Sequence, residues 1–225
     1  MQKINTFSDF VYPIDPSRFL VCGADEAGRG PIVGPVVAAC VVLDYKHEIH
    51  GLNDSKKLSE KKRLALFDEI VTKSLAVGVG MCTPKEIDSL NILKASLEAM
   101  KRAYFNMNLP TDCNLMLVDG NKKPEAMPLL VESVVKGDFK VREIAAASIV
   151  AKTIRDREMI KLDALYPQYG FKKHKGYPTK AHFEILESLP LLDCYRTTFA
   201  PVSRLIQKGH TLKPTNFTFD CRINF

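Results

Sequence analysis

Four acidic side chains stand where apolar, strand-like runs of the chain come to an end. Asp25 and Glu26 close the first run, Asp119 closes a later one, and Asp138 follows a third. In α/β sheets, ligands bind at such strand ends. If the strands of Asp25 and Asp119 are parallel neighbours, the four carboxylates meet, and their repulsion raises some of their pKa values unless divalent cations lie between them. We therefore predict a metal-binding cluster.

Carboxylate oxygens, without zinc-type ligands, indicate Mg²⁺ or Mn²⁺ as the metal. Two such ions about 3.5–4 Å apart can bind a phosphodiester, one activating water and the other stabilising the departing oxyanion. The acids also have an ordinary alternative, because Asp119 precedes a glycine and Asp138 follows one, both common turn positions. Strict strand alternation would point Asp25 and Glu26 to opposite faces. We expect Glu26 to lie where the strand ends and Gly28 lets the chain bend.

The turn after the first acids combines Gly28, Arg29 and Gly30 before Pro31. Glycines let the backbone approach a ligand closely. The spacing does not match the Gly-x-Gly-x-x-Gly of dinucleotide-binding proteins and leads into a strand, and no phosphate-loop Gly-Lys-Ser/Thr occurs. No Gly-x-Ser-x-Gly or His-Glu-x-x-His occurs either. These patterns argue against nucleotide-binding enzymes, serine hydrolases and zinc hydrolases.

Positive charge is concentrated in the second half of the chain. Residues 1–135 hold 16 Lys and Arg against 17 Asp and Glu, a balance of −1, whereas residues 136–213 hold 15 against 8, a balance of +7. Such a half can face a polyanion or be an ordinary solvated surface. Aromatic residues between 166 and 177 lie among lysines, which favours nucleic acid. The candidates for phosphate contacts are Lys56, Lys57, Lys152, Lys173 and Lys175.

Length and composition favour one intracellular domain with a full hydrophobic core. The chain has 225 residues, of which 46% are hydrophobic and 26% charged. Its longest apolar run, 32–43, is interrupted by Gly34 and Pro35 and is too short to cross a bilayer, and 1–19 holds no signal-peptide stretch. The six cysteines form no Cys-x-x-Cys pair, so we expect neither disulfides nor zinc. The protein should be cytoplasmic, without membrane contact.

Hydrophobic patterning predicts an α/β fold with a mixed central sheet flanked by helices and a helical C-terminal portion. Strands are expected over 19–25, 33–43, 75–82, 114–118 and 129–135, with the first two forming a hairpin. Helices are expected over 59–73, 91–106, 141–166 and 179–188, with a short one near Pro84. Within the helix over 141–166, the run 145–148 offers a small-residue face that can lie close to the sheet. Residues 189–204 are expected to be irregular, and those after 209 to have no core role.

Several blocks, in this order along the chain, resemble bacterial ribonuclease HII: Asp25-Glu26-Ala27-Gly28-Arg29-Gly30-Pro31, Asn53-Asp54-Ser55-Lys56-Lys57-Leu58, Val118-Asp119-Gly120, Lys136-Gly137-Asp138, Ala145-Ala146-Ala147-Ser148-Ile149-Val150-Ala151-Lys152, Arg155-Asp156-Arg157 and His174-Lys175-Gly176-Tyr177. The likeness covers about residues 19–205. It implies a ribonuclease H-like fold and an endonuclease dependent on Mn²⁺ or Mg²⁺. Such an enzyme cuts the RNA strand of RNA/DNA hybrids and incises duplex DNA at single ribonucleotides, as in ribonucleotide excision repair, leaving 3′-hydroxyl and 5′-phosphate ends.

The resemblance also implies which residues form the site. The family's catalytic, metal-binding carboxylates fall on the four acids described above. Its glycine-arginine-glycine turn, here residues 28–30, reads the 2′-hydroxyl of the ribonucleotide, the group by which RNA differs from DNA. Its tyrosine falls on Tyr177, where the resemblance implies packing on the deoxyribose that follows the ribonucleotide. Such a contact would select an RNA-to-DNA junction.

One departure from the family is visible near the C-terminus. The family usually has His-Arg before Ser-Phe-Ala-Pro, whereas this chain has Tyr195 and Arg196 before Thr-Thr-Phe-Ala-Pro. No role of that histidine is therefore carried over. We expect a monomer with an arm over 1–18, a catalytic domain over 19–208 whose helical portion spans about 166–208, and a tail of unknown role over 209–225.

Two alternatives stay open at this point. Ribonuclease HIII shares the fold and the chemistry but usually carries an extra N-terminal domain, for which we expect no room in the 18 residues before Phe19. A nucleic-acid-binding module without catalysis would also use the basic half, yet the acidic cluster would repel phosphate unless metals are bound. Cleavage of a duplex that contains one ribonucleotide separates the enzyme from the module.

Overall fold

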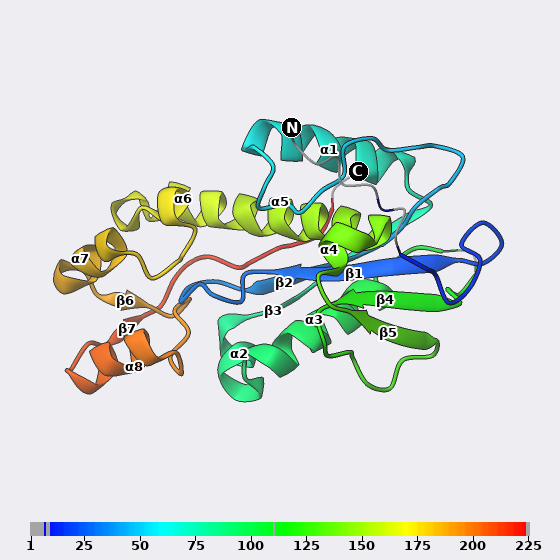
Figure 1. Ribbon diagram of the computed structural model, residues 1–225. Helices are drawn as coiled ribbons and strands as arrows, with labels where there is room; N and C mark the ends of the chain where they lie inside the picture. Colours follow the sequence, from blue (N-terminus) through cyan, green and yellow to red (C-terminus); the bar gives the residue numbers. More distant parts are fainter. Residues whose placement is uncertain (1–6, 8–9, 110, 224–225) are drawn as a thin grey trace.

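A five-stranded sheet forms the centre of the molecule in the computed structural model, which describes residues 7, 10–109 and 111–223. In the order β3-β2-β1-β4-β5, its strands are Ala76–Cys82, Val36–Val42, Val21–Ala27, Leu115–Asp119 and Leu130–Val134. The strands β1, β2 and β3 are antiparallel neighbours, whereas β4 and β5 run parallel to β1 (Figure 1). The predicted mixed sheet and its first hairpin are confirmed.

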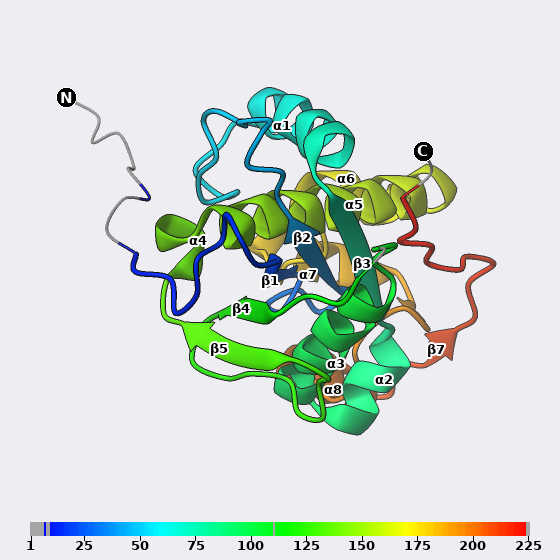
Figure 2. The same ribbon diagram turned by 90° about the vertical axis from the view of Figure 1, so that its right-hand side faces the viewer.

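Helices cover both faces of this sheet. On one face lie α1 (Glu60–Lys73) and α5 (Arg142–Leu165), and on the other α2 (Pro84–Leu90) and α3 (Ile92–Phe105), as Figure 2 shows. Helix α1 begins where the sequence predicts because the Ser59 hydroxyl accepts a hydrogen bond from a backbone N–H of the first turn. A buried hydrophobic cluster fills the space on each face, which gives the sheet two packed helical layers.

Helix α5 lies very close to β1, as its small residues predict. Ala145, Ala146 and Ala147 are fully buried. On the strand, a Cβ atom at Gly23 would lie 2.2 Å from the backbone carbonyl carbon of Glu143, too close for any side chain. Small residues on both elements therefore set the spacing between the helix and the strand that carries Asp25.

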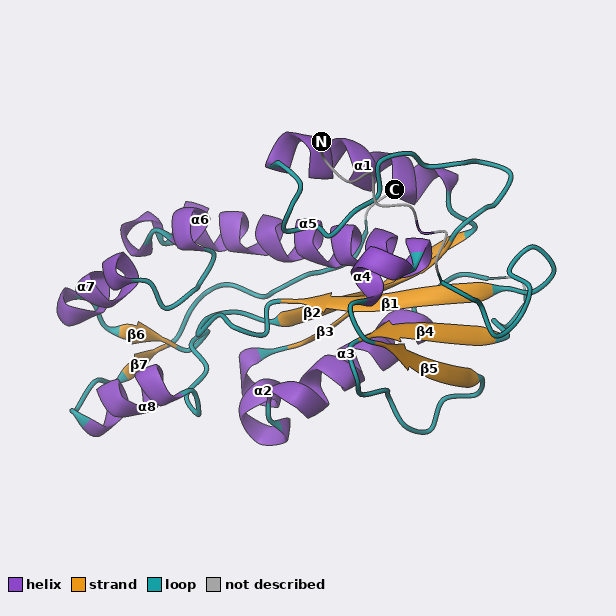
Figure 3. Cartoon of the chain, viewed as in Figure 1, coloured by secondary structure: helices purple, strands orange, loops and turns teal. Residues whose placement is uncertain are grey.

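The C-terminal portion lies beyond one end of the sheet (Figure 3). Its elements are the 3₁₀ turn η2 (Pro167–Tyr169), α6 (Phe171–His174), α7 (Lys180–Ser188), β6 (Leu191–Leu192), α8 (Ala200–Gln207) and β7 (Leu212–Lys213). A separate buried cluster holds it together, with Tyr169, Phe171 and Tyr195 packed against Ile32 and Val33. The portion is thus anchored to the segment between β1 and β2.

Two expectations about the C-terminal residues are wrong. The segment 189–204 is not irregular throughout, because α8 begins at Ala200. Residues after 209 do have a core role, since Phe219 and Cys221 are buried in two of the hydrophobic clusters. The division into arm, catalytic domain and tail, which reaches outside the described residues at both ends, stays a prediction.

All six cysteines are free and buried, and they pack as small hydrophobic side chains. Within the described ranges, no helix combines the length and the apolar character needed to span a membrane.

Candidate active site

The register between β1 and β4 aligns the first two acids. Ala24 pairs with Val118 in this parallel ladder, so Asp25 and Asp119 are the next residues on neighbouring strands, and their side chains point to the same face. Asp25 is 6% exposed, and Asp119 is partly buried at the end of its strand. The predicted shared site requires the strands of Asp25 and Asp119 to be parallel neighbours, and they are.

Glu26 does not lie where its strand ends, contrary to expectation. Strand β1 continues to Ala27, and Glu26 pairs with Ala38 because the antiparallel ladder with β2 extends past the acids. The Glu26 carboxylate nevertheless interacts electrostatically with Asp119 on the neighbouring strand β4. Burial raises the pKa of Glu26, the Arg29 guanidinium at 3.4 Å opposes this, and the charge of Asp119 raises it further.

Asp138 is positioned by the short helix α4 (Gly137–Lys140), which follows β5. The N–H of Gly137 donates to Asp119 Oδ1 at 2.7 Å and so ties the start of α4 to the end of β4. Lys136, with φ 57°, makes the left-handed turn between strand and helix. Asp138 therefore lies in the first turn of α4, next to the residue that Asp119 binds.

Burial and mutual repulsion raise the pKa values of these carboxylates. Burial, and then the charges of Glu26 and Asp119, raise the pKa of Asp25 well above its usual range. Burial, and then the charges of Asp119 and Asp54, raise the pKa of Asp138 to about 6. Acids from β1, β4 and α4 thus act on one another as one electrostatic cluster.

The donor atoms of this cluster suit a divalent cation. They are carboxylate oxygens, which Mg²⁺ and Mn²⁺ prefer. Across the described residues, Asp25, Asp119 and Asp138 form no ion pair with lysine or arginine, so their charge is available to a cation. In the same part of the chain, however, no three acidic, histidine or cysteine side chains converge closely enough to hold an ion. The metal centre therefore stays a prediction.

The glycine-arginine turn (residues 28–30) follows directly after β1. Gly28 has φ +98°, and a Cβ atom there would lie 2.8 Å from the carbonyl oxygen of Pro35, so the position requires glycine. Gly30 faces the ring of Tyr177, whose nearest carbon would lie 3.2 Å from a Cβ atom on Gly30. Tyr177 as a whole residue is 41% exposed. The fold thus brings Tyr177, distant in sequence, against the turn.

Four of the five candidate lysines are accessible to a ligand. Lys56, Lys57 and Lys173 are exposed, and Lys175 is partly exposed. Lys56 lies near enough to the acids for its charge to oppose the rise in the pKa of Asp138. Contacts between these lysines and phosphate stay a prediction.

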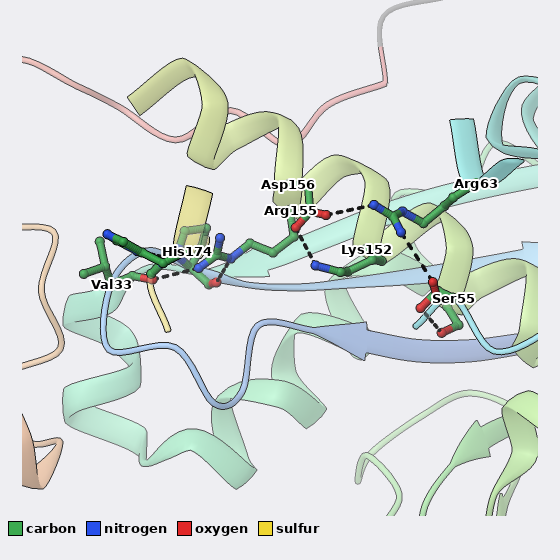
Figure 4. Close-up of polar contacts among 10 residues, drawn as sticks. Val33, Ser55, Arg63, Lys152, Arg155, Asp156 and His174 are labelled. Carbon is green, nitrogen blue, oxygen red and sulfur yellow. Dashed lines mark hydrogen bonds and ion pairs between the residues drawn. The ribbon is translucent and has the colours of Figure 1, made fainter. Parts of the chain in front are cut away.

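Lys152, the fifth, is engaged inside the protein. Its Nζ lies 2.6 Å from Asp156 Oδ1, and Arg63 binds the other oxygen of that carboxylate at 3.1 Å (Figure 4). The Lys152 side chain is 21% exposed. The shared carboxylate links α5 to α1, so Lys152 has a structural partner in addition to the phosphate contact predicted for it.

Comparison with known proteins decides the family. The family model described as Ribonuclease HII matches residues 22–202, which is most of the chain. A protein named Ribonuclease HII from Vibrio campbellii is 57% identical over 187 residues, which cover 83% of this chain and 87% of that protein. The chain belongs to the ribonuclease HII family. It is therefore a type 2 ribonuclease H, an enzyme.

Solved structures agree with the ribonuclease H-like fold. The ribonuclease H2 of Pyrococcus horikoshii OT3 matches with a TM-score of 0.70 at 28% identity, covering 84% of this chain and 98% of its own. Bst-RNase HIII, in a complex with Mn²⁺, matches with a TM-score of 0.60 at 17% identity, covering 84% of this chain and 70% of its own. The predicted α/β fold is confirmed.

Two serines in the ribonuclease HII blocks support Asp25, a role that the sequence did not reveal. Ser148 of α5 hydrogen-bonds to the Asp25 carboxylate and lowers the pKa that burial raises. Its hydroxyl also lies 3.0 Å from that of Ser55. Both residues stand in the recognised blocks, but only the packing of α5 on β1 reveals what they contact.

Tyr195, where ribonuclease HII usually has histidine, is buried beneath the loop that carries Tyr177. Its hydroxyl lies 2.8 Å from His182 Nε2, and His182 Nδ1 lies 2.9 Å from the carbonyl oxygen of Tyr177. A neutral His182 protonated on Nδ1 satisfies both contacts. The tyrosine hydroxyl thus completes a chain of hydrogen bonds that ends on the backbone of Tyr177.

Proposed function

We propose that this chain is an endoribonuclease that hydrolyses the RNA strand of RNA/DNA hybrids and incises duplex DNA at single ribonucleotides. The products carry 3′-hydroxyl and 5′-phosphate ends. The observation that carries the proposal is the parallel register of β1 and β4, which aligns Asp25 with Asp119. Membership of the ribonuclease HII family supports the same activity.

In this proposal, Asp25, Glu26, Asp119 and Asp138 hold divalent cations, Mn²⁺ or Mg²⁺. Their raised pKa values support it, because buried carboxylates that repel one another are stabilised by a nearby cation. When bound, the cations supply activation of water and stabilisation of the departing oxyanion. The chain contributes the orientation of the oxygens. The N–H of Glu26 donates to Asp25 Oδ1 at 2.7 Å, and the N–H of Gly137 donates to Asp119 Oδ1 at 2.7 Å.

Selection of the substrate falls to the chain's own residues near the acids. The glycine-arginine turn exposes its backbone beside the cluster, where it contacts the 2′-hydroxyl of the ribonucleotide. The ring of Tyr177, held against this turn, packs on the sugar that follows. Lys56, Lys57, Lys173 and Lys175 bind the flanking phosphates.

Cleavage mapping tests this function. A duplex with one ribonucleotide, and separately a uniform RNA/DNA hybrid, is incubated with the protein and Mg²⁺, Mn²⁺ or a chelator. We expect a single cut beside the ribonucleotide and many cuts along the hybrid RNA, both only with metal. Retarded migration of the duplex without a cut in either metal would favour a binding module without catalysis.

We further propose that the protein acts as a monomer in the cytoplasm, removing ribonucleotides from DNA. The acids, the turn and Tyr177 all come from one chain, which supports a monomer. Light scattering on the purified protein should give the mass of one chain, and the mass of a dimer would overturn this part of the proposal.

A further inference from the structure

A fully buried arginine lies behind the glycine-arginine turn. Arg196 is 0% exposed, and its guanidinium donates to four backbone carbonyls. Nη2 bonds to Gly28 at 2.6 Å, Nη1 bonds to Arg29 at 3.1 Å and to Pro31 at 2.6 Å, and Nε bonds to Gly34 at 2.9 Å. One side chain from the C-terminal portion therefore fixes the backbone of the whole turn.

These bonds also fix where the amide groups of the turn point. In a trans peptide, the carbonyl of one residue and the N–H of the next point in opposite directions. Because Arg196 holds the carbonyls of Gly28 and Arg29 inward, the N–H groups of Arg29 and Gly30 point outward. Both residues are exposed, and neither amide donates to another of the described residues. The turn therefore presents two free donors on the side away from Arg196.

The position of Arg196 is costly for the protein. No carboxylate forms an ion pair with it among the described residues, although Asp88 contributes a favourable charge. Burial lowers the pKa of Arg196 to about 9, and its guanidinium lies 5.1 Å from the ring centre of Phe199. A buried cation whose hydrogen bonds all go to carbonyls, with no ion pair, is seldom the most stable choice for a core. What these hydrogen bonds secure is the conformation of the turn.

Arg155 offers a matched comparison on the same loop. It is 2% exposed, and it donates to the carbonyl of Val33 at 2.8 Å (Figure 4). It also donates to the carbonyl of Pro35 at 3.2 Å. It does not hydrogen-bond to the carbonyls of residues 28 and 29. Arg155 therefore supports only the buried half of the loop, whereas Arg196 extends from Gly34 in that half to the carbonyls of residues 28 and 29.

We propose that Arg196 is a positioning residue that presets the amide donors of Arg29 and Gly30 to receive the 2′-hydroxyl oxygen of the ribonucleotide. The inference rests on the proposed function, because it assumes that this turn reads the ribonucleotide. Because Arg196 already holds the amides in place, binding of the substrate does not have to order them, and this lowers the free-energy cost of binding. A deoxyribonucleotide lacks the oxygen and gains nothing from them.

The test compares Arg196→Lys, Arg196→Met and Arg155→Lys with the unchanged protein. For each we measure kcat and KM on a duplex with one ribonucleotide, and Ki for the all-DNA duplex of the same sequence as a competitor. Arg196→Met loses all four hydrogen bonds and Arg196→Lys loses the planar fork that makes them together, so both should lower kcat/KM, by about 10- to 100-fold in Arg196→Met. Ki should stay within about twofold, because the all-DNA duplex does not use the amides. Arg155→Lys should leave the ratio of kcat/KM to 1/Ki unchanged.

If folded Arg196 variants lose kcat/KM and competitor affinity by the same factor, the inference is wrong. It is also wrong if Arg196→Met discriminates between the ribonucleotide duplex and the all-DNA duplex as well as the wild type does. If the Arg196 variants do not fold, the amide ¹H–¹⁵N signals of Arg29 and Gly30 in the unchanged protein decide. They should shift with the ribonucleotide duplex and not with the all-DNA duplex, and equal shifts would refute the role. If the unchanged protein cuts neither substrate in any metal, the proposed function itself fails.

Discussion

Asp25 combines features that a purely structural acid rarely has. It is nearly buried, it lies beside two other carboxylates, and it forms no ion pair with lysine or arginine among the described residues. An uncompensated buried charge destabilises a fold. Groups of this kind are concentrated at functional sites, where a bound ion or substrate compensates them.

Replacement of Asp119 by Asn should abolish cleavage without unfolding the protein. The amide oxygen can still accept the N–H of Gly137, so the link between β4 and α4 is kept. Removal of one negative charge also lowers the repulsion on Asp25 and Asp138. Thermal unfolding should therefore be unchanged or shifted upward, while cleavage of the one-ribonucleotide duplex is lost. Normal turnover in Mg²⁺ would count against the site.

Replacement of Tyr177 by Ala should weaken junction selectivity more than binding to a plain hybrid. The ring lies against Gly30 and is partly exposed, so its loss removes the proposed sugar contact without opening the core. The kcat/KM ratio between a junction duplex and a uniform hybrid measures the effect, and Tyr177→Phe serves as the control that keeps the ring. Equal losses on both substrates would refute the sugar-packing role.

Residue-scale prediction from the sequence succeeds where only local pattern matters. The placement of Asp119 at the end of β4 follows from an apolar run that stops at an acid, whereas Asp25 lies two residues before the end of β1. The role of Arg196 could not be predicted, because four carbonyls from another part of the chain define it. Glu26 was misplaced because the ladder with β2 continues one residue past it, a tertiary effect.

At the scale of elements, the contact between α5 and β1 connects packing to the site. Helix α5 carries Ser148, which bonds to the Asp25 carboxylate, and strand β1 carries Asp25 itself. Gly23 permits the approach of the two elements. Any residue that pushes the helix away should therefore disturb both stability and the carboxylate.

Replacement of Gly23 by Ala should destabilise the protein by about 1–3 kcal/mol or more, as overpacking does. Gly80→Ala is the matched control, because a Cβ atom there would lie 2.3 Å from the carbonyl oxygen of Ala99 in α3, on the opposite face. Urea unfolding should detect both losses, and only Gly23→Ala should also lower the specific activity of the folded protein. Unfolding of Gly23→Ala at the wild-type midpoint would contradict the close approach.

The loop that carries Tyr177 should lose stability in acid through His182. Burial lowers the pKa of His182 to about 4, and the stacked ring of His174 adds to this. Unfolded histidine has a pKa near 6.5, so between these values the unfolded chain binds more protons and stability falls as pH falls. Relative to His182→Gln, the wild type should lose about 2 kcal/mol between pH 7 and pH 5. Parallel pH profiles of unfolding for the two proteins would show that His182 is not buried in its neutral form.

Element-scale prediction depends on length and on caps. Helix α1 was predicted closely, because Ser59 caps a long apolar stripe. Helix α8 was missed because it is short, although Pro201 in its first turn is a recognisable start signal. Its N-cap Phe199 makes no side-chain hydrogen bond, so the usual polar cap is lacking.

At the scale of the whole molecule, two distant parts of the chain build the proposed site. The sheet and α4 supply the acids, and the C-terminal portion supplies Tyr177 and the buried Arg196. The sequence predicts both parts but not how they meet. The last residues show the same limit, because Phe219 packs into the core from an extended segment that has no helical or strand periodicity.

The most direct test of the central claim, that folding gathers four acids around divalent cations, is anomalous diffraction from crystals that contain Mn²⁺ and a one-ribonucleotide duplex. We predict anomalous peaks within ligand distance of Asp25, Glu26, Asp119 and Asp138, and their loss in crystals of Asp119→Asn. Mn²⁺ peaks that lie only at other sites, in a protein that cleaves the duplex with Mn²⁺, would contradict the account.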